Sequence, residues 1–569
     1  MFQNEKIIET KICKHCQSSF EIYQKDKEML ELISPIFSGN KFILPLPTDC
    51  PKCRRQKRLA FRNISKLYRR KCDFSGNNIF SSYDENVKHP VYDTNIWDSD
   101  KWSPLDYGMD FDFSKSFFTQ FDELKDKVPM YSRSIFNIEN SDYCNNASYI
   151  KDCYLCFGTG YSENCYYSIS LRDAKNCFDC YGVNLSENCF ECVDCNNCNK
   201  LFYSQNSNDC SNSYFLKNCN NCKNCFGCKN LVNQNYCIFN KRYEKADYEK
   251  KVKDLLENTF GELKREVNQF FVKVPEKYTN GVNCENVIGE YINNSKNVFL
   301  SFDIINGEDL RYCSHLKDKT KNLMDVDIFG WGLERCYESV SLGHNSSNIY
   351  FSFHCWENTK NLFYCSFCVR NVSNCFGCIG LHDGYEYCIL NKQYTKEEYE
   401  LLVLRIIEHM QKTKEWGRFF HQSFSSYGYN QTEGIFSDPM NKKEAIEKGF
   451  KWSDYEPPFP KVDKIIPANK LPENIADIPD DILNRAIECE ITKKPFRIIK
   501  QELEFYRKHN LPISKRHPDQ RHLDRMALRN PRKLFDRKCD KCGKNIKTTY
   551  SPERLEIVYC EECYNKEIY

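Results

Sequence analysis

Eight cysteines near the two ends of the chain are spaced as metal ligands. They form four Cys-x2-Cys pairs: Cys13 with Cys16, Cys50 with Cys53, Cys539 with Cys542, and Cys560 with Cys563. A Cys-x2-Cys turn presents two thiolates to one ion, and tetrahedral zinc takes four such ligands. The spacing therefore predicts two zinc ions, one at each end of the chain, in modules of the treble-clef or zinc-ribbon type.

The two ends are copies of one module. Residues 58–97 align without gaps on residues 525–564, and sixteen of the forty positions are identical. The four C-terminal cysteines face Cys72, Ser75, Asp93 and Ile96, whereas the four N-terminal cysteines face Cys489, Thr492, His517 and Gln520. Each module is thus predicted to keep one metal site and to have lost the other, since two ligands without a third rarely hold a metal.

A basic stretch follows the second cysteine pair, and a similar stretch occupies the other module. Pro51 suits the first turn of a helix, which we expect over residues 53–63. The basic residues that we single out are Arg54, Arg55, Lys57, Arg58, Arg62, Arg521, Arg525 and Arg529. A zinc-anchored basic helix can bind the phosphates of structured RNA, so RNA or a ribonucleoprotein is the first predicted partner. The alternative is a helix face that pairs with acidic residues of the same chain.

A different cysteine pattern fills the middle of the chain. Sixteen cysteines from Cys144 to Cys237 all fall at positions divisible by three. The grid recurs in a second array, mostly with a 13-residue repeat, where Val298, Leu310 and Leu323 take equivalent places. Metal ligands would not exchange with leucine, whereas a free cysteine packs as a small hydrophobe. Repeats of 12 or 13 residues are too short for helical repeats, so we predict two narrow β-solenoids in a mainly β chain.

Alternative interpretations of the middle of the chain remain open: iron–sulfur binding, partner binding and catalysis. The two Cys-x2-Cys-x2-Cys-x2-Cys runs, residues 189–198 and 219–228, approach the spacing of iron–sulfur proteins but lack the ferredoxin gap and proline. Outward aromatic and polar ladders could bind a protein partner, although solvated β-faces have the same composition. His315, His344 and His354 lie near Glu334 and Asp327, but their spacing fixes no common site, and we favour a protein that is not an enzyme.

A second duplication divides the chain further. Residues 224–249 match residues 374–400, and each copy runs into an apolar-periodic segment, 245–257 or 396–410, that is expected to form a helix capping its array. The predicted parts are an N-terminal zinc module (1–97), a helical linker (98–135), the first solenoid and capping helix (136–270), the second solenoid and capping helix (271–412), a linker (413–480) and a C-terminal zinc module (481–569).

Composition indicates where such a chain resides. It has 569 residues, 35 cysteines and a formal net charge of +2, without a signal-peptide pattern or a long apolar run. We therefore expect a soluble cytoplasmic protein with no membrane contact. Thiols stay reduced in the cytosol, which favours metal sites and buried cysteines over disulfides.

Several of these motifs together resemble a known group of proteins. CPKCRRQKRLAFRN, the NC(Y/F) repeats, NCFGCKNL, FYRKHNLPISKRHPDQR and CDKCGKNIKTTYSPERLEIVYCEECY look like an uncharacterised family of long, cysteine-rich zinc-ribbon proteins of candidate-phyla bacteria. The resemblance covers nearly the whole chain. It implies cytosolic zinc binding and nothing catalytic.

Overall fold

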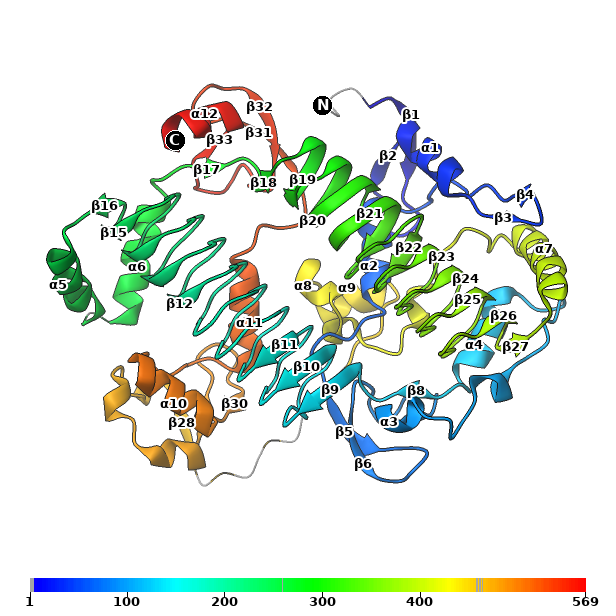
Figure 1. Cartoon of the computed structure of the whole chain (residues 1–569), viewed down its shortest axis with the longest axis horizontal. Coiled ribbons are helices and arrows are strands. Elements are labelled where there is room, and N and C mark those ends of the chain that lie inside the picture. Colours follow the sequence, from blue (N-terminus) through cyan, green and yellow to red (C-terminus); the bar gives the residue numbers. More distant parts are fainter. Residues whose placement is uncertain (1–4, 258, 457–458, 460–461, 463, 569) are drawn as a thin grey trace.

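The computed structural model of the chain describes residues 5–257, 259–456, 459, 462 and 464–568. Two β-solenoids run in opposite directions, and the terminal modules pack around them (Figure 1). The prediction of a mainly β chain with short-coil β-solenoids is confirmed. No helix in the described ranges is long and apolar enough to cross a membrane.

The first solenoid is a stack of 12-residue coils. Its strands are β9 (Ile135–Glu139), β10 (Ala147–Lys151), β11 (Gly160–Glu163), β12 (Asn199–Phe202), β13 (Ser211–Tyr214), β14 (Lys223–Phe226), β15 (Asn235–Ile238) and β16 (Lys241–Arg242). Parallel pairs such as Cys225 with Cys237 give the 12-residue register, and isolated bridges such as Phe178 with Phe190 continue it between β11 and β12. Helices α5 (Lys245–Leu256) and α6 (Phe260–Phe271) follow.

The second solenoid begins with 11- and 12-residue steps and continues with 13-residue coils. Its strands are β18 (Gly281–Val282), β19 (Glu285–Asn293), β20 (Lys296–Arg311), β21 (Ser314–Asp327), β22 (Tyr337–Val340), β23 (Ser347–Tyr350), β24 (Lys360–Phe363), β25 (Ser373–Phe376), β26 (Glu386–Ile389) and β27 (Lys392–Gln393). They form one sheet in sequence order, parallel except for the last pair. Helix α7 (Lys396–Lys412) closes this half.

The triplet pattern reflects the corners of the coils. In the run from Asn188 to Cys198, every third residue has a left-handed backbone, with φ between 51° and 56°, and the next residue is an inward cysteine. Asn and Asp tolerate this conformation better than most residues, which explains their frequency before the cysteines. The 13-residue coils place their extra residue at a corner, where Arg370 and Asn371 are both left-handed.

The interior of each coil accepts both thiols and hydroxyls because both can bond to the backbone. Cys192 Sγ donates to the carbonyl of Leu201 at 3.2 Å. Ser186 Oγ donates to the carbonyl of Asn184 at 2.6 Å and accepts from the amide of Cys198 at 3.0 Å. The cysteines of the two runs 189–198 and 219–228 are at most 3% exposed. The grid cysteines therefore pack as core residues.

The two solenoids end in the same way, as the second duplication predicts. Asn240 accepts from the amide of Lys229 and donates to its carbonyl, and Asn391 makes the same two bonds to Ile379. The predicted capping helices are present as α5 and α7. Helix α6 was not predicted from the sequence, although Thr259 and Glu262 form a capping box at its start.

The modules contribute the remaining elements. In the N-terminal part these are β1 (Ile7–Ile12), β2 (Ser19–Tyr23), α1 (Gln24–Ile33), β3 (Ile36–Phe37), β4 (Asn40–Lys41), α2 (Pro51–Leu59), β5 (Tyr68–Lys71), β6 (Asn78–Ser81), β7 (Val91–Tyr92), α3 (Thr94–Trp97), α4 (Phe117–Lys125) and β8 (Met130–Tyr131). Strand β17 (Glu276–Lys277) precedes the second solenoid. The later linker and the C-terminal module contain α8 (Gly434–Ser437), α9 (Lys442–Glu447), β28 (Ile465–Pro467), β29 (Ala486–Glu488), β30 (Pro495–Phe496), α10 (Lys500–His509), α11 (Pro518–Ala527), β31 (Phe535–Lys538), β32 (Asn545–Thr548), β33 (Val558–Tyr559) and α12 (Glu561–Ile568). Helix α2 ends four residues earlier than expected.

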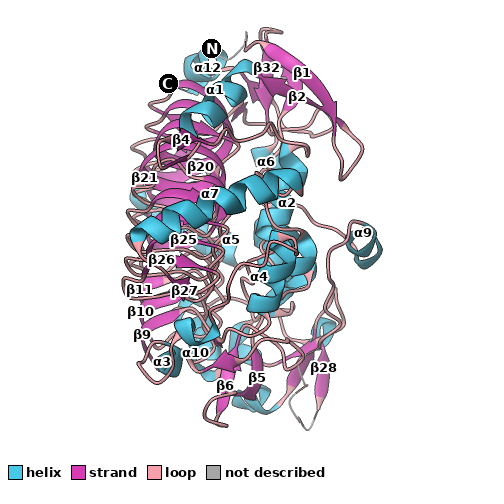
Figure 2. Cartoon of the chain, turned by 90° about the vertical axis from the view of Figure 1, so that its right-hand side faces the viewer, coloured by secondary structure: helices cyan, strands magenta, loops and turns pink. Residues whose placement is uncertain are grey.

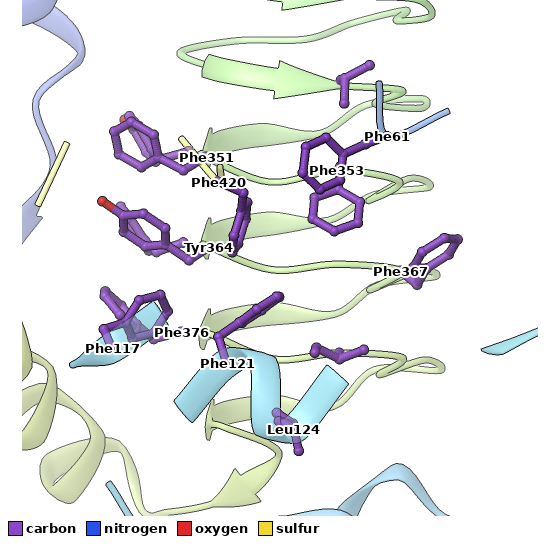
Figure 3. Close-up of a cluster of buried hydrophobic side chains, with 14 of the residues drawn as sticks. Phe61, Phe117, Phe121, Leu124, Phe351, Phe353, Tyr364, Phe367, Phe376 and Phe420 are labelled. Atoms are coloured by element: carbon purple, nitrogen blue, oxygen red, sulfur yellow. The ribbon is translucent and has the colours of Figure 1, made fainter. Parts of the chain in front are cut away.

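Both linkers cover the second solenoid. Helices α2 and α4 lie on one side of the strand layer (Figure 2). An outward aromatic column of the solenoid, in which Phe351 stacks on Tyr364 at 4.7 Å between ring centroids, meets Phe117 and Phe121 of α4 and Phe420 of the later linker (Figure 3). The predicted ladders are thus partly intramolecular core.

Candidate metal centres and their docking on the solenoids

The N-terminal cluster combines a hairpin turn with the start of a helix. Cys13 and Cys16 lie in the turn between β1 and β2, and Cys50 and Cys53 lie at the start of α2. The four Sγ atoms all lie within 4.8 Å of one another. The amide of Cys50 donates to Cys13 Sγ at 3.3 Å. A hydrogen bond from the Cys53 thiol lowers the pKa of Cys50 to about 5, which favours the thiolate that a metal binds.

The C-terminal cluster repeats this construction. Cys539 and Cys542 lie in the turn between β31 and β32, and Cys560 and Cys563 lie at the start of α12. Their Sγ atoms also lie within 4.8 Å of one another. The amide of Cys560 donates to Cys539 Sγ at 3.2 Å. Burial raises the pKa of Cys539, but backbone amides that donate to its sulfur outweigh burial and lower it to about 6.

These two clusters match the predicted ligand sets and could each hold a metal ion. Among the described residues, no other three ligand groups of cysteine, histidine or carboxylate come as close together. The cysteine runs 189–198 and 219–228 form no such group, so nothing in their geometry supports an iron–sulfur site.

The positions that lost their cysteines keep the local fold. The amide of Asp93 donates to Cys72 Sγ at 3.2 Å, as the amide of Cys560 does to Cys539. The Asp93 side chain caps α3 instead of offering a ligand. At the other lost site, His517 caps α11 through the amide of Asp519.

The basic residues of the N-terminal module face carboxylates of the second solenoid. Arg54 and Arg58 lie one helical turn apart on α2 and are 4% and 0% exposed. Arg54 contacts Asp325 at 2.8 Å, and Arg58 contacts Asp327 and Glu338, each at 2.7 Å. Burial raises the pKa of Glu338 although the arginines oppose it. We call this group the N-terminal clamp.

The aligned residues of the C-terminal module form a second clamp on the first solenoid. Arg521 and Arg525, which align with Arg54 and Arg58, both contact Asp179, at 2.7 and 2.8 Å. Glu191 lies 3.8 Å from Arg525. In both clamps the arginine pair faces acidic residues on successive coils, 13 residues apart in one solenoid and 12 in the other. We call this group the C-terminal clamp.

Arg529 joins the two solenoids directly. It contacts Asp194 of the first solenoid at 2.7 Å and pairs with Asp303 of the second. Its guanidinium lies between the rings of Tyr181 and Tyr291, about 5 Å from each centroid (5.2 and 5.1 Å). An arginine held by two carboxylates and two aromatic faces fixes the solenoids relative to each other.

The remaining predicted basic residues also have partners within the chain. Arg55 contacts Asp438 at 2.7 Å and Lys57 contacts Asp49 at 2.6 Å. Arg62 donates to Ser341 Oγ at 2.6 Å. None of the eight singled-out basic side chains is exposed. This arrangement does not support the expected RNA contacts. It agrees with the alternative, in which the basic side chains pair with groups of the same chain.

The three histidines do not share a site. His354 Nε2 lies 2.9 Å from the carbonyl of Phe61, and His344 packs against Trp331. His315 meets Asp303 and Arg532.

The clamp carboxylates were missed in the sequence. The sequence signal that could have identified them is an acidic residue before the inward position on two successive coils, as at Asp179 and Glu191.

No protein-family model matches the chain, and no curated protein matches it either.

Proposed function

We propose that the chain is a non-catalytic zinc-binding scaffold, in which two zinc-anchored modules of the treble-clef or zinc-ribbon type clamp two solenoids. Four thiolates in a closed set are the usual ligands of structural zinc. The observation that carries the proposal is the burial of Arg58 and Arg525 against solenoid carboxylates, at 0% and 1% exposure. Each arginine lies on a helix within its zinc module, so the metal would stabilise the docked position.

The partner that this scaffold fits best is a protein. The basic side chains are used inside the chain, which weakens the case for RNA. Near the start of the first solenoid, Phe136, Tyr149 and Tyr161 are 62%, 43% and 50% exposed. The last two rings stack at 4.8 Å with 9° between their planes. A row of exposed aromatic rings is a frequent feature of protein interaction surfaces.

Metal analysis tests the first part of the proposal. Protein purified without oxygen should contain two zinc ions per chain and no iron or sulfide. Cys50→Ser should lose one zinc ion and increase hydrogen exchange in α2 and in β21. Cys284→Ser is the control, because Cys284 is an exposed cysteine outside both clusters. Iron with sulfide would contradict the proposal.

Partner capture tests the second part. Proteins crosslinked to the chain in its own cells should remain bound after nuclease treatment, and Tyr149→Ser with Tyr161→Ser should reduce their recovery. Loss of every partner on nuclease treatment would favour RNA or a ribonucleoprotein instead.

A further inference from the structure

A cavity of about 450 Å³ lies between the N-terminal module and the second solenoid. Its floor is one row of residues on successive coils: Arg335, Asn348, Asn361, Asn374 and Tyr387. One wall is the end of α1 with the β3–β4 hairpin, and the other wall is the start of α7. Ser38 Oγ donates to Glu400 Oε2 at 3.0 Å and joins the two walls. The volume is typical of small-molecule sites.

The floor offers hydrogen-bonding groups at a regular spacing. Asn348 Nδ2 donates to Asn361 Oδ1 at 2.8 Å, and Asn361 Nδ2 donates to Asn374 Oδ1 at 2.9 Å. This ladder uses one N–H and one lone pair of the central amide and leaves the other N–H and lone pair for a ligand. Neighbouring coils are about 4.8 Å apart, so the amides repeat at that distance along the cavity.

Charged side chains also line the cavity: Lys41, Arg335 and Lys396 are cationic, and Glu400 is acidic. Arg335 lies 3.5 Å from Glu334. Lys396 begins α7, whose first turn carries Glu397 and Glu398. The amide of Glu398 already donates to Thr395 Oγ1 in the helix cap. The lining is therefore polar, with charged side chains as well as the amide row.

Aromatic rings complete the lining. Tyr350 and Phe363 stack at 4.8 Å beside the amide row, and they line the cavity with only 2% and 3% of their surface exposed. Tyr399 lines it from α7, and its buried hydroxyl has no hydrogen-bond partner among the described residues. The ligand-binding groups are thus mainly the side-chain amides of the row, which suit a ligand that has many hydroxyl groups.

We propose that this cavity binds an extended β-linked oligosaccharide, which lies along the row of asparagines. The unit repeat of an extended pyranose chain is close to the spacing of the coils, so successive sugar units meet successive amides. An α-linked chain curves away from a straight row. This site is additional to the clamps and to the aromatic row of the first solenoid.

Calorimetry with the full zinc-loaded chain tests the site. Cellotetraose and chitotetraose are the β-linked probes, and maltotetraose is the curved control. We expect saturable binding of at least one β-linked probe, weakened at least tenfold by Asn361→Gly. Glycine keeps the left-handed backbone of this position, where φ is 53°.

The matched control is Asn221→Gly. Asn221 belongs to a similar ladder, where it donates to Asn233 at 2.7 Å, but it lies on the first solenoid away from the cavity. This variant should bind the probe as the unchanged chain does. The proposal is overturned if no β-linked probe binds at millimolar concentration, if maltotetraose binds equally well, or if Asn361→Gly and Asn221→Gly behave alike while both keep two zinc ions.

Discussion

Replacement of Arg58 by methionine tests the N-terminal clamp most directly. The Arg58 side chain is fully buried and lies within 3.1 Å of Asp325 and 2.7 Å of Asp327 and Glu338. Removing one partner of a buried ion pair costs about 3–5 kcal/mol, because the other charge stays buried without compensation. We expect Arg58→Met to lower the stability by about 3–5 kcal/mol. The loss should not exceed this range, because Arg54 still compensates the charge of Asp325.

The effect should depend on pH with a definite sign. Burial already raises the pKa of Glu338, and loss of Arg58 would raise it further. The folded chain then holds more protons than the unfolded chain, so its stability falls as pH rises. The cost of Arg58→Met should therefore be larger at pH 8 than at pH 5.

Hydrogen exchange is the suitable assay, because a chain of several parts does not unfold in one step. The quantity to compare is the free energy of local opening of α2 and of β21. Lys66→Met is the control, since Lys66 forms an exposed ion pair with Asp519, with side chains 38% and 56% exposed. Such a pair contributes about 0–1 kcal/mol. Equal effects of the two substitutions would refute the clamp.

Three further substitutions test the solenoids. Burial raises the pKa of Glu290 from 4.5 to about 7, so the stability of the folded chain should fall as pH rises through this window. Glu290→Gln should therefore increase the free energy of unfolding at pH 8 by up to about 3 kcal/mol, measured by denaturant unfolding. An unchanged pH profile would contradict this. Asn197 lies at a coil corner with φ of 53°, a left-handed backbone that valine disfavours. Asn197→Val should therefore lower stability by about 1–2 kcal/mol relative to Asn197→Gly. Equal melting temperatures of the two variants would show that the corner does not require a left-handed residue. Cys192→Ala should cost about 1 kcal/mol for a small cavity without changing the zinc content, whereas loss of a metal ion would assign Cys192 to a site.

Local spacing carried most of what the sequence could predict. The cysteine clusters follow from pairs of cysteines with two residues between them, and the coils follow from a short repeat that both arrays share. The corner conformation of Asn188 and its equivalents explains this repeat, because it places the next side chain inward every third residue. The capping helices were predictable because their apolar residues recur within one helical turn.

Docking between distant segments could not be predicted in this way. Arg58 and Asp327 are 269 residues apart, and nothing in either segment alone shows that they meet. The outward aromatic column that contains Phe351 was expected to face solvent or a partner, because nothing in the sequence of either linker shows which surface it covers. To predict the ion pairs of the two clamps, both modules would have to be compared with both solenoids at the same time.

The internal duplication explains why each module contacts both solenoids. In the N-terminal half, β7 pairs in parallel with β8, which leads into the first solenoid, while α2 clamps the second. In the C-terminal half, β33 pairs in parallel with β17, which leads into the second solenoid, while α11 clamps the first.

The two halves are therefore joined twice by equivalent contacts. The hairpin that lacks a full set of ligands keeps its local fold, as the hydrogen bond from the amide of Asp93 to Cys72 Sγ shows. The cysteine cluster is kept in the N-terminal module where the chain leads into α2 and its clamp. In the C-terminal module it is kept where α12 follows the strand that pairs with β17. The two cysteine clusters, which could each hold a metal ion, thus lie at the two points where the module must hold its shape to join one half of the chain to the other.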